Sequence, residues 1–456
     1  MKKILLVHLP FCTPASPAYS ITYLYSFLKN NSKINPKINI DFLDLNLEFH
    51  KLRFPEFQKY YQDINNWKDY DKKTAEYNRL TSKTYSENNK KVVNGKKPEL
   101  FDLILKKITD KKPDIVAFSI VYSSQAFYAY SLIKELKESK QIMCFIGGPA
   151  INDKLSRIAD KTLNNEIELL NAIEESKIKH EDLNFKFHLD FSIYNLNEYF
   201  TPYPVIPLKT SSSCYYKQCA FCTHFSKIPY YELNIENIRE TIIHSRQKYF
   251  FLVDDMIHAK RLMKIAKIFR PLNIKWTCQL RPTKELSLET LKILRESGLT
   301  MIMWGVESGN DRILKLIRKG TNKKDIEMVL KNSHDAGIKN VVYMLFGFPT
   351  ETKEEFFETI EFLKTNEKNI DLVSVSVFGL QKGSAAYNNP EKFGISEIHE
   401  EKRTILEPKI TYDVKTGLSK KEVGELREKY KKTIDNINKY PKTMNYFREH
   451  MFCIIG

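Results

Sequence analysis

Alternating strand-like and helix-like segments in the second half of the chain constrain its fold more than any other feature. Apolar, β-branched runs typical of buried strands are separated by segments in which apolar residues recur every three or four positions. Strands connected through helices lie parallel, and six such units predict an incomplete parallel barrel. The predicted strands are 205–208, 249–253, 274–280, 301–306, 340–346 and 372–378.

Three closely spaced cysteines follow the first of these strands. Cys214, Cys219 and Cys222 lie in SSSCYYKQCAFCTH, with the spacing C-x4-C-x2-C. In parallel barrels the functional loops leave the carboxyl ends of the strands, so this loop is a candidate metal centre. The spacing leaves two interpretations open. One is a zinc knuckle completed by His224, and the other is a four-iron four-sulfur cluster with one iron left for a substrate or cofactor.

Four further motifs follow the cysteines in a fixed order. They are FLVDDM at 251–256, Trp276 with Arg281, GVESGNDRILKLIRKG at 305–320 and FGFPTET at 346–352. With the three-cysteine loop, they resemble the radical S-adenosylmethionine (SAM) superfamily over about residues 204–383. That superfamily usually spaces its cysteines C-x3-C-x2-C, and the extra residue here resembles subfamilies with a cobalamin-type N-terminal domain. The resemblance implies a 4Fe-4S cluster bound by the three cysteines, and a zinc-stabilised binding protein is the non-enzyme alternative.

The resemblance also implies a set of SAM-binding residues. Carboxylates at the strand ends suit the methionyl ammonium or the ribose hydroxyls, and arginines suit the methionyl carboxylate. Structural interpretations stand beside these, because Asp255 or Ser308 can cap a helix. Arg318 can complement a helix dipole, and Gly347 can serve an ordinary turn. The expected SAM-binding residues are Phe221, Asp254, Asp255, Arg281, Glu307, Ser308, Arg318 and Gly347.

The first 150 residues predict a separate α/β domain. Short apolar runs at 4–7, 38–43, 115–120 and 142–146 alternate with helical segments. This alternation is typical of a Rossmann-like, doubly wound parallel sheet, in which ligands bind at the carboxyl ends of the strands.

Ser119, Gly147 and Gly148 end two of these strands, and similar residues line the cobalamin pocket of relatives. We therefore expect them to contact cobalamin. No Asp-x-His-x-x-Gly sequence follows the first strand, so no histidine is predicted as a lower cobalt ligand. A Gly-Glu-Gly-Glu-like loop is also missing after Gly148, which leaves open a vestigial cobalamin domain.

Changes in composition along the chain predict four regions. The last of them is expected to lie against the open side of the barrel and to shape the substrate pocket. The regions are a cobalamin-binding-like Rossmann domain over 1–150 with a helical insertion at about 51–110, a linker over 151–203, a radical SAM partial (β/α)6 barrel over 204–385, and a small helical C-terminal region over 386–456.

Composition limits the compartment and the partners. Seven cysteines, an odd number with three clustered, favour a reducing compartment, and we expect a cytoplasmic protein. The net charge is +16, but the lysines are interspersed with acidic residues, so a nucleic-acid partner is not expected. No apolar run approaches the ~18 residues of a membrane span, so no membrane partner is expected either.

These observations predict a radical SAM enzyme that cleaves SAM reductively with its 4Fe-4S cluster. The expected reaction is cobalamin-dependent C-methylation of a small-molecule or peptide-derived substrate. The electron would come from a donor such as flavodoxin or ferredoxin. The alternative keeps the radical SAM chemistry but catalyses an oxidation or a rearrangement, with cobalamin binding lost.

Overall fold

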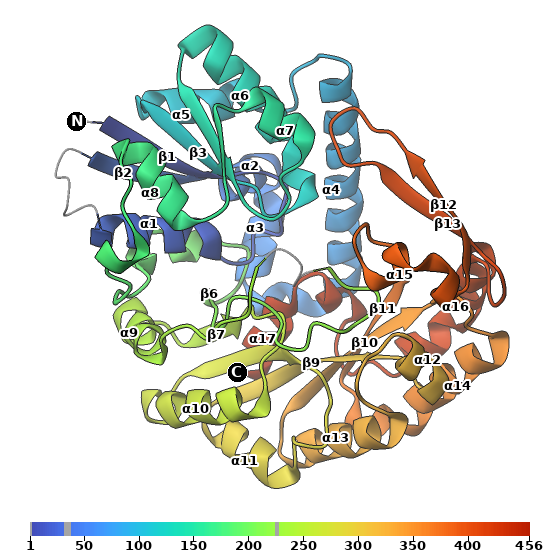
Figure 1. Cartoon of the computed structure of the whole chain (residues 1–456). Helices are drawn as coiled ribbons and strands as arrows, with labels where there is room; N and C mark the ends of the chain where they lie inside the picture. The colour runs from blue at the N-terminus through green and yellow to red at the C-terminus, as the bar shows by residue number, and fades with distance from the viewer. Residues whose placement is uncertain (1, 32–37, 224–227) are drawn as a thin grey trace. The chain divides into compact units, whose positions relative to one another are not determined.

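The computed structural model describes residues 2–31, 38–223 and 228–456 and divides the chain into two compact units (Figure 1). The N-terminal unit comprises Met1–Pro204 with Glu240–Arg246 and Lys402–Glu407. The C-terminal unit comprises Val205–Arg239, Gln247–Glu401 and Pro408–Gly456. Among the described helices, none has both the length and the apolar character required to cross a membrane.

A five-stranded parallel sheet forms the centre of the N-terminal unit (Figure 1). Its order, β2-β1-β3-β4-β5, is that of flavodoxin-like doubly wound folds, which confirms the predicted fold class. The short strand β5 was not predicted, because it has only three residues and none of them is buried. The strands are β1 (Lys2–His8), β2 (Ile38–Asp44), β3 (Ile115–Ser119), β4 (Met143–Gly147) and β5 (Lys161–Leu163).

Helices surround this sheet, and four of them lie between β2 and β3 in the sequence. Helix α4 is the longest of the four and buries a stripe of side chains that includes Thr74, Tyr77 and Asn88. Leu28 of α1 and Leu169 of α8 share one hydrophobic core with the sheet residue Ile4. The helices are α1 (Tyr19–Asn31), α2 (Leu45–Arg53), α3 (Pro55–Gln62), α4 (Tyr70–Val93), α5 (Phe101–Asp110), α6 (Ala126–Lys140), α7 (Asp153–Ile158) and α8 (Glu166–Glu174).

A second parallel sheet, with six strands, forms the C-terminal unit (Figure 1). In the order β11-β10-β9-β8-β7-β6, each strand lies next to the strands that precede and follow it in the sequence. The strands β6 and β11 form the two edges. This is the predicted partial barrel. Its strands are β6 (Val205–Leu208), β7 (Tyr249–Leu252), β8 (Lys275–Leu280), β9 (Leu299–Glu307), β10 (Lys339–Phe346) and β11 (Leu372–Val377).

Helices cover the outer face of this sheet. Trp276 packs against Phe269 of α10 with ring centroids 5.6 Å apart. Trp304 donates a hydrogen bond to Asn340 at 2.7 Å, and Asn340 in turn donates to the carbonyl of Leu330 in α13 at 3.0 Å. The connecting helices are α9 (Ile235–Ser245), α10 (Ala259–Phe269), α11 (Leu288–Glu296), α12 (Asp311–Leu316), α13 (Lys323–Asp335) and α14 (Lys353–Thr365).

Strand alternation then defines the inner face of the barrel. Side chains on successive strand residues point to opposite faces. Trp304 and Asn340 lie on the helix-covered face, so Gly305 and Tyr343, which are paired across β9 and β10, lie on the inner face.

The C-terminal region contains helices and, in addition, an antiparallel strand pair that was not predicted. The pair is β12 (Ile395–Glu401) with β13 (Lys409–Val414). Its sequences, ISEIHEE and KITYDV, are largely exposed and rich in charge, so they lack the apolar signal of a buried strand. The helices are α15 (Ala385–Asn388), α16 (Lys420–Asp435) and α17 (Arg448–Ile455).

The segment between α16 and α17 pairs with the edge strand β11. The Asn438 side chain accepts a hydrogen bond from the Val373 amide at 2.7 Å, and Asn445 donates one to the Val373 carbonyl at 2.8 Å. The Lys439 amide donates to the Asp371 carbonyl at 2.9 Å. These bonds satisfy backbone groups that an open sheet edge would expose. The tail therefore lies against the open side of the barrel, as predicted.

Candidate functional site

The three cysteines lie on one loop that leaves the carboxyl end of β6. None of the three cysteines forms a disulfide, and all three are half-buried. The Cys222 amide donates a hydrogen bond to the Cys219 carbonyl at 3.2 Å. A single tetrahedral zinc ion would hold its sulfur ligands about 3.8 Å apart. Among the described residues, the cysteines do not form such a group, since the set with ligand atoms within 4.8 Å is Glu397, His399 and Asp413. The three sulfur atoms are therefore not gathered as closely as the ligands of one zinc ion would be.

The zinc interpretation also requires His224 as a fourth ligand. His224 lies outside the described residues, so the structure adds nothing to that part of the hypothesis.

Asp254 anchors the start of the cysteine loop. Its carboxylate accepts hydrogen bonds from the backbone amides and the hydroxyls of Thr210 and Ser211, at 2.6 to 3.0 Å. Burial raises the pKa of this carboxyl, and the hydrogen bonds from Ser211 and Thr210 oppose that effect. Asp254 is thus occupied by the loop itself, whereas the neighbouring Asp255 is only half-buried.

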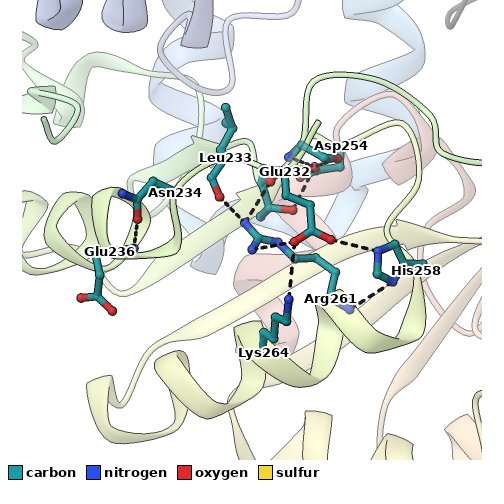
Figure 2. Close-up of polar contacts among 10 residues, drawn as sticks. Glu232, Leu233, Asn234, Glu236, Asp254, His258, Arg261 and Lys264 are labelled. Atoms are coloured by element: carbon teal, nitrogen blue, oxygen red, sulfur yellow. Dashed lines mark hydrogen bonds and ion pairs between the residues drawn. The ribbon is translucent and has the colours of Figure 1, made fainter. Parts of the chain in front are cut away.

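Arg261 of α10 ties together the two ends of the same loop (Figure 2). Its guanidinium donates to the carbonyl oxygens of Thr210 at 3.1 Å and Leu233 at 2.6 Å. It also pairs with Glu232 at 3.2 Å, and His258 lies 3.0 Å from the other oxygen of that carboxylate. The Arg261 side chain is only 4% exposed. Sequence reasoning missed this arginine, because no motif marks it.

Arg281 is a second arginine that contacts the cysteine loop. Its guanidinium stacks 3.7 Å from the ring centroid of Tyr216 and donates to the Tyr215 hydroxyl at 3.4 Å. It also donates to the Lys319 carbonyl at 3.2 Å, while the Tyr216 hydroxyl donates to the Arg318 carbonyl at 2.9 Å. The structure therefore places Arg281 against the cysteine loop, where it contacts two loop tyrosines, and its contact with SAM stays a prediction.

Lys319, and not the predicted Arg318, directs its side chain toward the cysteines. Arg318 is exposed and lines a surface depression with Lys392. Its left-handed φ of 56° turns the chain, so that Lys319 is buried and only 4% exposed. The Lys319 ammonium lies 2.7 Å from Glu307 and 5.8 Å from the ring centroid of Phe221.

Electrostatic effects connect Lys319 with Cys219. Burial lowers the pKa of Lys319, but the charges of Glu307 and Cys219 outweigh it, and the net shift is upward. Burial raises the pKa of Cys219 to about 11, and the Lys319 charge acts in the opposite direction. A cation at this position favours a thiolate over a thiol, which is the form that binds a metal.

Gly305 makes room for the Lys319 ammonium. A Cβ atom at Gly305 would lie 2.6 Å from Lys319 Nζ and 3.1 Å from Glu307 Oε1. Glu307 itself has a left-handed φ of 69°, a conformation uncommon for a residue with a side chain and found most often at functional positions.

Two other predicted SAM-binding residues serve the protein's own structure. Ser308 Oγ lies 3.2 Å from Thr359 Oγ1 and accepts a hydrogen bond from the Asn310 amide at 3.1 Å. At Gly347, with a φ of 74°, a Cβ atom would lie 2.8 Å from Val423 of α16. The structure shows no contact of Ser308 or Gly347 with the cysteine loop among the described residues, whereas Glu307 is connected with Phe221 through Lys319.

The predicted cobalamin residues also have internal partners. Ser119 Oγ donates to Ser20 Oγ at 2.8 Å. Gly148 has a φ of 121°, and a Cβ atom there would lie 2.3 Å from the Ile120 carbonyl oxygen. At the same sheet edge, Tyr122 exposes 55% of its surface. The lack of a side chain at Gly148 is thus required for close chain packing, and the contact of these residues with cobalamin stays a prediction.

A three-cysteine loop at the carboxyl end of the first strand of a partial parallel barrel, in a chain that also contains a doubly wound sheet, defines an α/β protein with a candidate metal centre. Residues 208–363 match the model of the radical SAM superfamily. The barrel of this chain is therefore similar to the radical SAM superfamily, and the chain shares its fold with two enzymes of known structure described next.

Relatives and solved structures agree with this assignment. An uncharacterized methyltransferase of Pyrococcus horikoshii is 25% identical over 62% of this chain and 72% of its own. The cobalamin-dependent SAM radical enzyme OxsB, solved with aqua-cobalamin, has a TM-score of 0.54 at 16% identity, covering 86% of this chain and 55% of OxsB. The radical SAM methyltransferase TsrM from Kitasatospora setae, solved with cobalamin and a [4Fe-4S] cluster, has a TM-score of 0.56 at 13% identity, covering 85% and 74%.

The chain thus spans about half the length of OxsB. At these identities the structural likeness establishes the shared fold, and the activity of this chain is addressed separately below.

Proposed function

We propose that Cys214, Cys219 and Cys222 bind a [4Fe-4S] cluster and that SAM binds at the iron without a protein ligand. The observation that carries this proposal is the loop itself, with three half-buried cysteines outside any disulfide and the buried Lys319 beside Cys219. Soft thiolates are the preferred protein ligands of iron–sulfur clusters.

The chain's own residues have distinct tasks in this proposal. Asp254, Arg261 and Arg281 hold the loop in one conformation through the contacts described above. The Lys319 ammonium lies 5.8 Å from the ring centroid of Phe221, and this aromatic ring can pack against an adenine. Glu307 and Asp255 supply carboxylates for the SAM ammonium or ribose.

We propose further that the N-terminal domain binds cobalamin and that the protein methylates an unactivated carbon of a small-molecule or peptide-derived substrate. When bound, the [4Fe-4S] cluster would supply the electron that cleaves SAM, and cobalamin would supply the methyl group that is transferred. The similarity to a methyltransferase relative and the fold shared with OxsB and TsrM support this choice. An electron donor such as flavodoxin or ferredoxin and a cytoplasmic location complete the proposal.

A second candidate function is a radical SAM oxidation or rearrangement without cobalamin. Two observations favour it. The Ser119 hydroxyl is engaged by Ser20, and the space beside Gly148 is filled by the Ile120 carbonyl. In that case the doubly wound domain has lost its ligand and serves as a scaffold.

Anaerobic reconstitution of the full chain with iron, sulfide and hydroxocobalamin tests the proposal. After desalting, about four irons and one cobalt per chain are expected. Incubation with SAM and a reductant should then give 5′-deoxyadenosine, and turnover with a substrate should add S-adenosylhomocysteine. Iron without cobalt would select the second candidate function. Zinc in place of iron would overturn both, and Cys219→Ser is the matched control for cluster loss.

A further inference from the structure

Helix α17 lies on the inner face of the partial barrel, where it contacts β9 (Figure 1). Phe452 of α17 packs on Tyr249 of β7 with ring centroids 5.4 Å apart. At the other end of the helix, the Arg448 guanidinium lies 4.7 Å from the ring centroid of Tyr343 of β10. Tyr343 is on the inner face by strand alternation. The C-terminal helix therefore spans the inner face from β7 to β10.

The first turn of α17 brings two charged side chains to this face. Tyr343, Arg448 and Glu449 are all half-buried, so part of each remains accessible to solvent. Burial raises the pKa of Tyr343 to about 12, with Arg448 opposing the shift and Glu449 and Glu307 adding to it. The charges of Arg448, Glu449 and Glu307 therefore all act on the Tyr343 hydroxyl.

Arg448 lacks the partners that a half-buried arginine normally has. Its Nε–H group is buried and donates to no acceptor among the described residues. Arg448 also forms no ion pair with any described carboxylate, although Glu449 is its neighbour in sequence. Leaving a buried guanidinium nitrogen without an acceptor is energetically unfavourable. An arginine retained under such a cost has a donor fork available for an incoming anion.

We propose that Arg448 and Tyr343 bind an oxyanion group of the substrate, a carboxylate or a phosphate, on the inner face of the barrel. The inference rests on the proposed function and adds the chemical class of the substrate. The guanidinium offers two parallel N–H donors that match a carboxylate or phosphate edge, and the Tyr343 hydroxyl offers a third donor. Glu307 and Lys319 lie on the same face next to the cysteine loop, since Gly305 is paired with Tyr343.

Equilibrium binding of two simple anions tests this site. The reconstituted full-length protein is titrated with inorganic phosphate and, separately, with acetate, and binding is followed by calorimetry. Saturable binding of at least one anion is expected. Arg448→Met should weaken it about tenfold or more, because a charge-assisted hydrogen-bonded pair is lost. Arg448→Lys and Tyr343→Phe should weaken it less, since each keeps part of the donor set.

The control variant is Arg79→Met, which removes an exposed arginine of α4. Tighter binding of phosphate or of acetate identifies which oxyanion the substrate carries. The inference is overturned if the wild-type protein shows no saturable binding, or if Arg79→Met weakens binding as much as Arg448→Met. It is also overturned if saturating SAM displaces the anion, because the site would then belong to the SAM carboxylate.

The same samples separate this inference from the proposed function. Cluster content is read from the absorption spectrum before each titration. Lost anion binding with a full cluster contradicts only the oxyanion site, whereas a missing cluster contradicts the proposed function. If Arg448→Met fails to fold by circular dichroism, Arg448→Lys and Tyr343→Phe carry the test.

Discussion

Lys319 of the C-terminal unit places its ammonium 2.7 Å from the Glu307 carboxylate, and both side chains are nearly buried, at 5% and 13% exposure. The two residues come from opposite ends of α12, and the left-handed turn at Arg318 brings them together. Their pairing fixes the charge beside Cys219, the most central of the predicted cluster ligands in sequence.

Removing one partner of this ion pair should destabilise the protein strongly. Lys319→Met leaves the Glu307 carboxylate buried without a partner, at an expected cost of about 3 to 5 kcal/mol in the free energy of unfolding. The double variant Lys319→Met with Glu307→Leu should recover most of that loss. Anaerobic denaturant titrations of the wild type, both single variants and the double variant measure the coupling. Equal stability of the single and double variants would contradict a coupled pair.

The space beside Gly305 should be essential for the same pair. In Gly305→Ala the new methyl group would meet Lys319 Nζ at 2.6 Å, so the ammonium must move away from Glu307. We expect a loss of about 1 to 3 kcal/mol in stability and a marked fall in reductive SAM cleavage. Gly424→Ala is the matched control, since a Cβ atom there meets nothing within 4 Å. That helical change should be neutral or slightly stabilising.

The adjacent carboxylates Asp254 and Asp255 should respond differently to the same substitution. In Asp254→Asn an amide group would face the donors of Thr210 and Ser211, which leaves buried groups unsatisfied at about 1 to 3 kcal/mol. Its iron content after reconstitution should therefore fall. Asp255→Asn should keep its iron and bind SAM more weakly, as measured by equilibrium dialysis. If Asp255→Asn lost iron and Asp254→Asn only bound SAM more weakly, Asp255 would hold the loop and Asp254 would bind SAM.

Residue patterns were sufficient to predict the two parallel sheets. Each of the ten strands of the two parallel sheets other than β5 is a run of apolar residues between helical segments, so periodicity alone locates it. The strands β5, β12 and β13 were not predicted, because they are short or charged and their pairing depends on residues outside the strand itself.

Single side chains were harder to predict than strands. The motif at 305–320 led to the prediction of Arg318. Because Arg318 itself has a left-handed φ, its side chain is exposed and that of Lys319 is buried instead. Arg448 and Arg261 belong to no motif, and their roles arise from helix packing on the barrel. Local sequence records neither effect.

Glu351 should make the stability of the protein depend on pH near neutrality. Its carboxyl is fully buried, accepts a hydrogen bond from the Gly347 amide at 2.5 Å and has one oxygen without a partner. Burial raises the pKa of Glu351 from 4.5 to about 7, while the Gly347 hydrogen bond opposes the shift.

Because the pKa is higher in the folded state than in the unfolded chain, the protonated Glu351 carboxyl stabilises the folded state fully below pH 4.5. This contribution is lost as the pH rises through about 7. Glu351→Gln keeps an acceptor for Gly347 and cannot ionise, so it should raise stability at pH 8 by on the order of 1 to 3 kcal/mol and change it little at pH 4.5. Melting temperatures at both pH values measure the difference. Glu354→Gln, an exposed change three residues away in the first turn of α14, should show no such pH dependence, and an equal response of the two variants would contradict the buried-acid assignment.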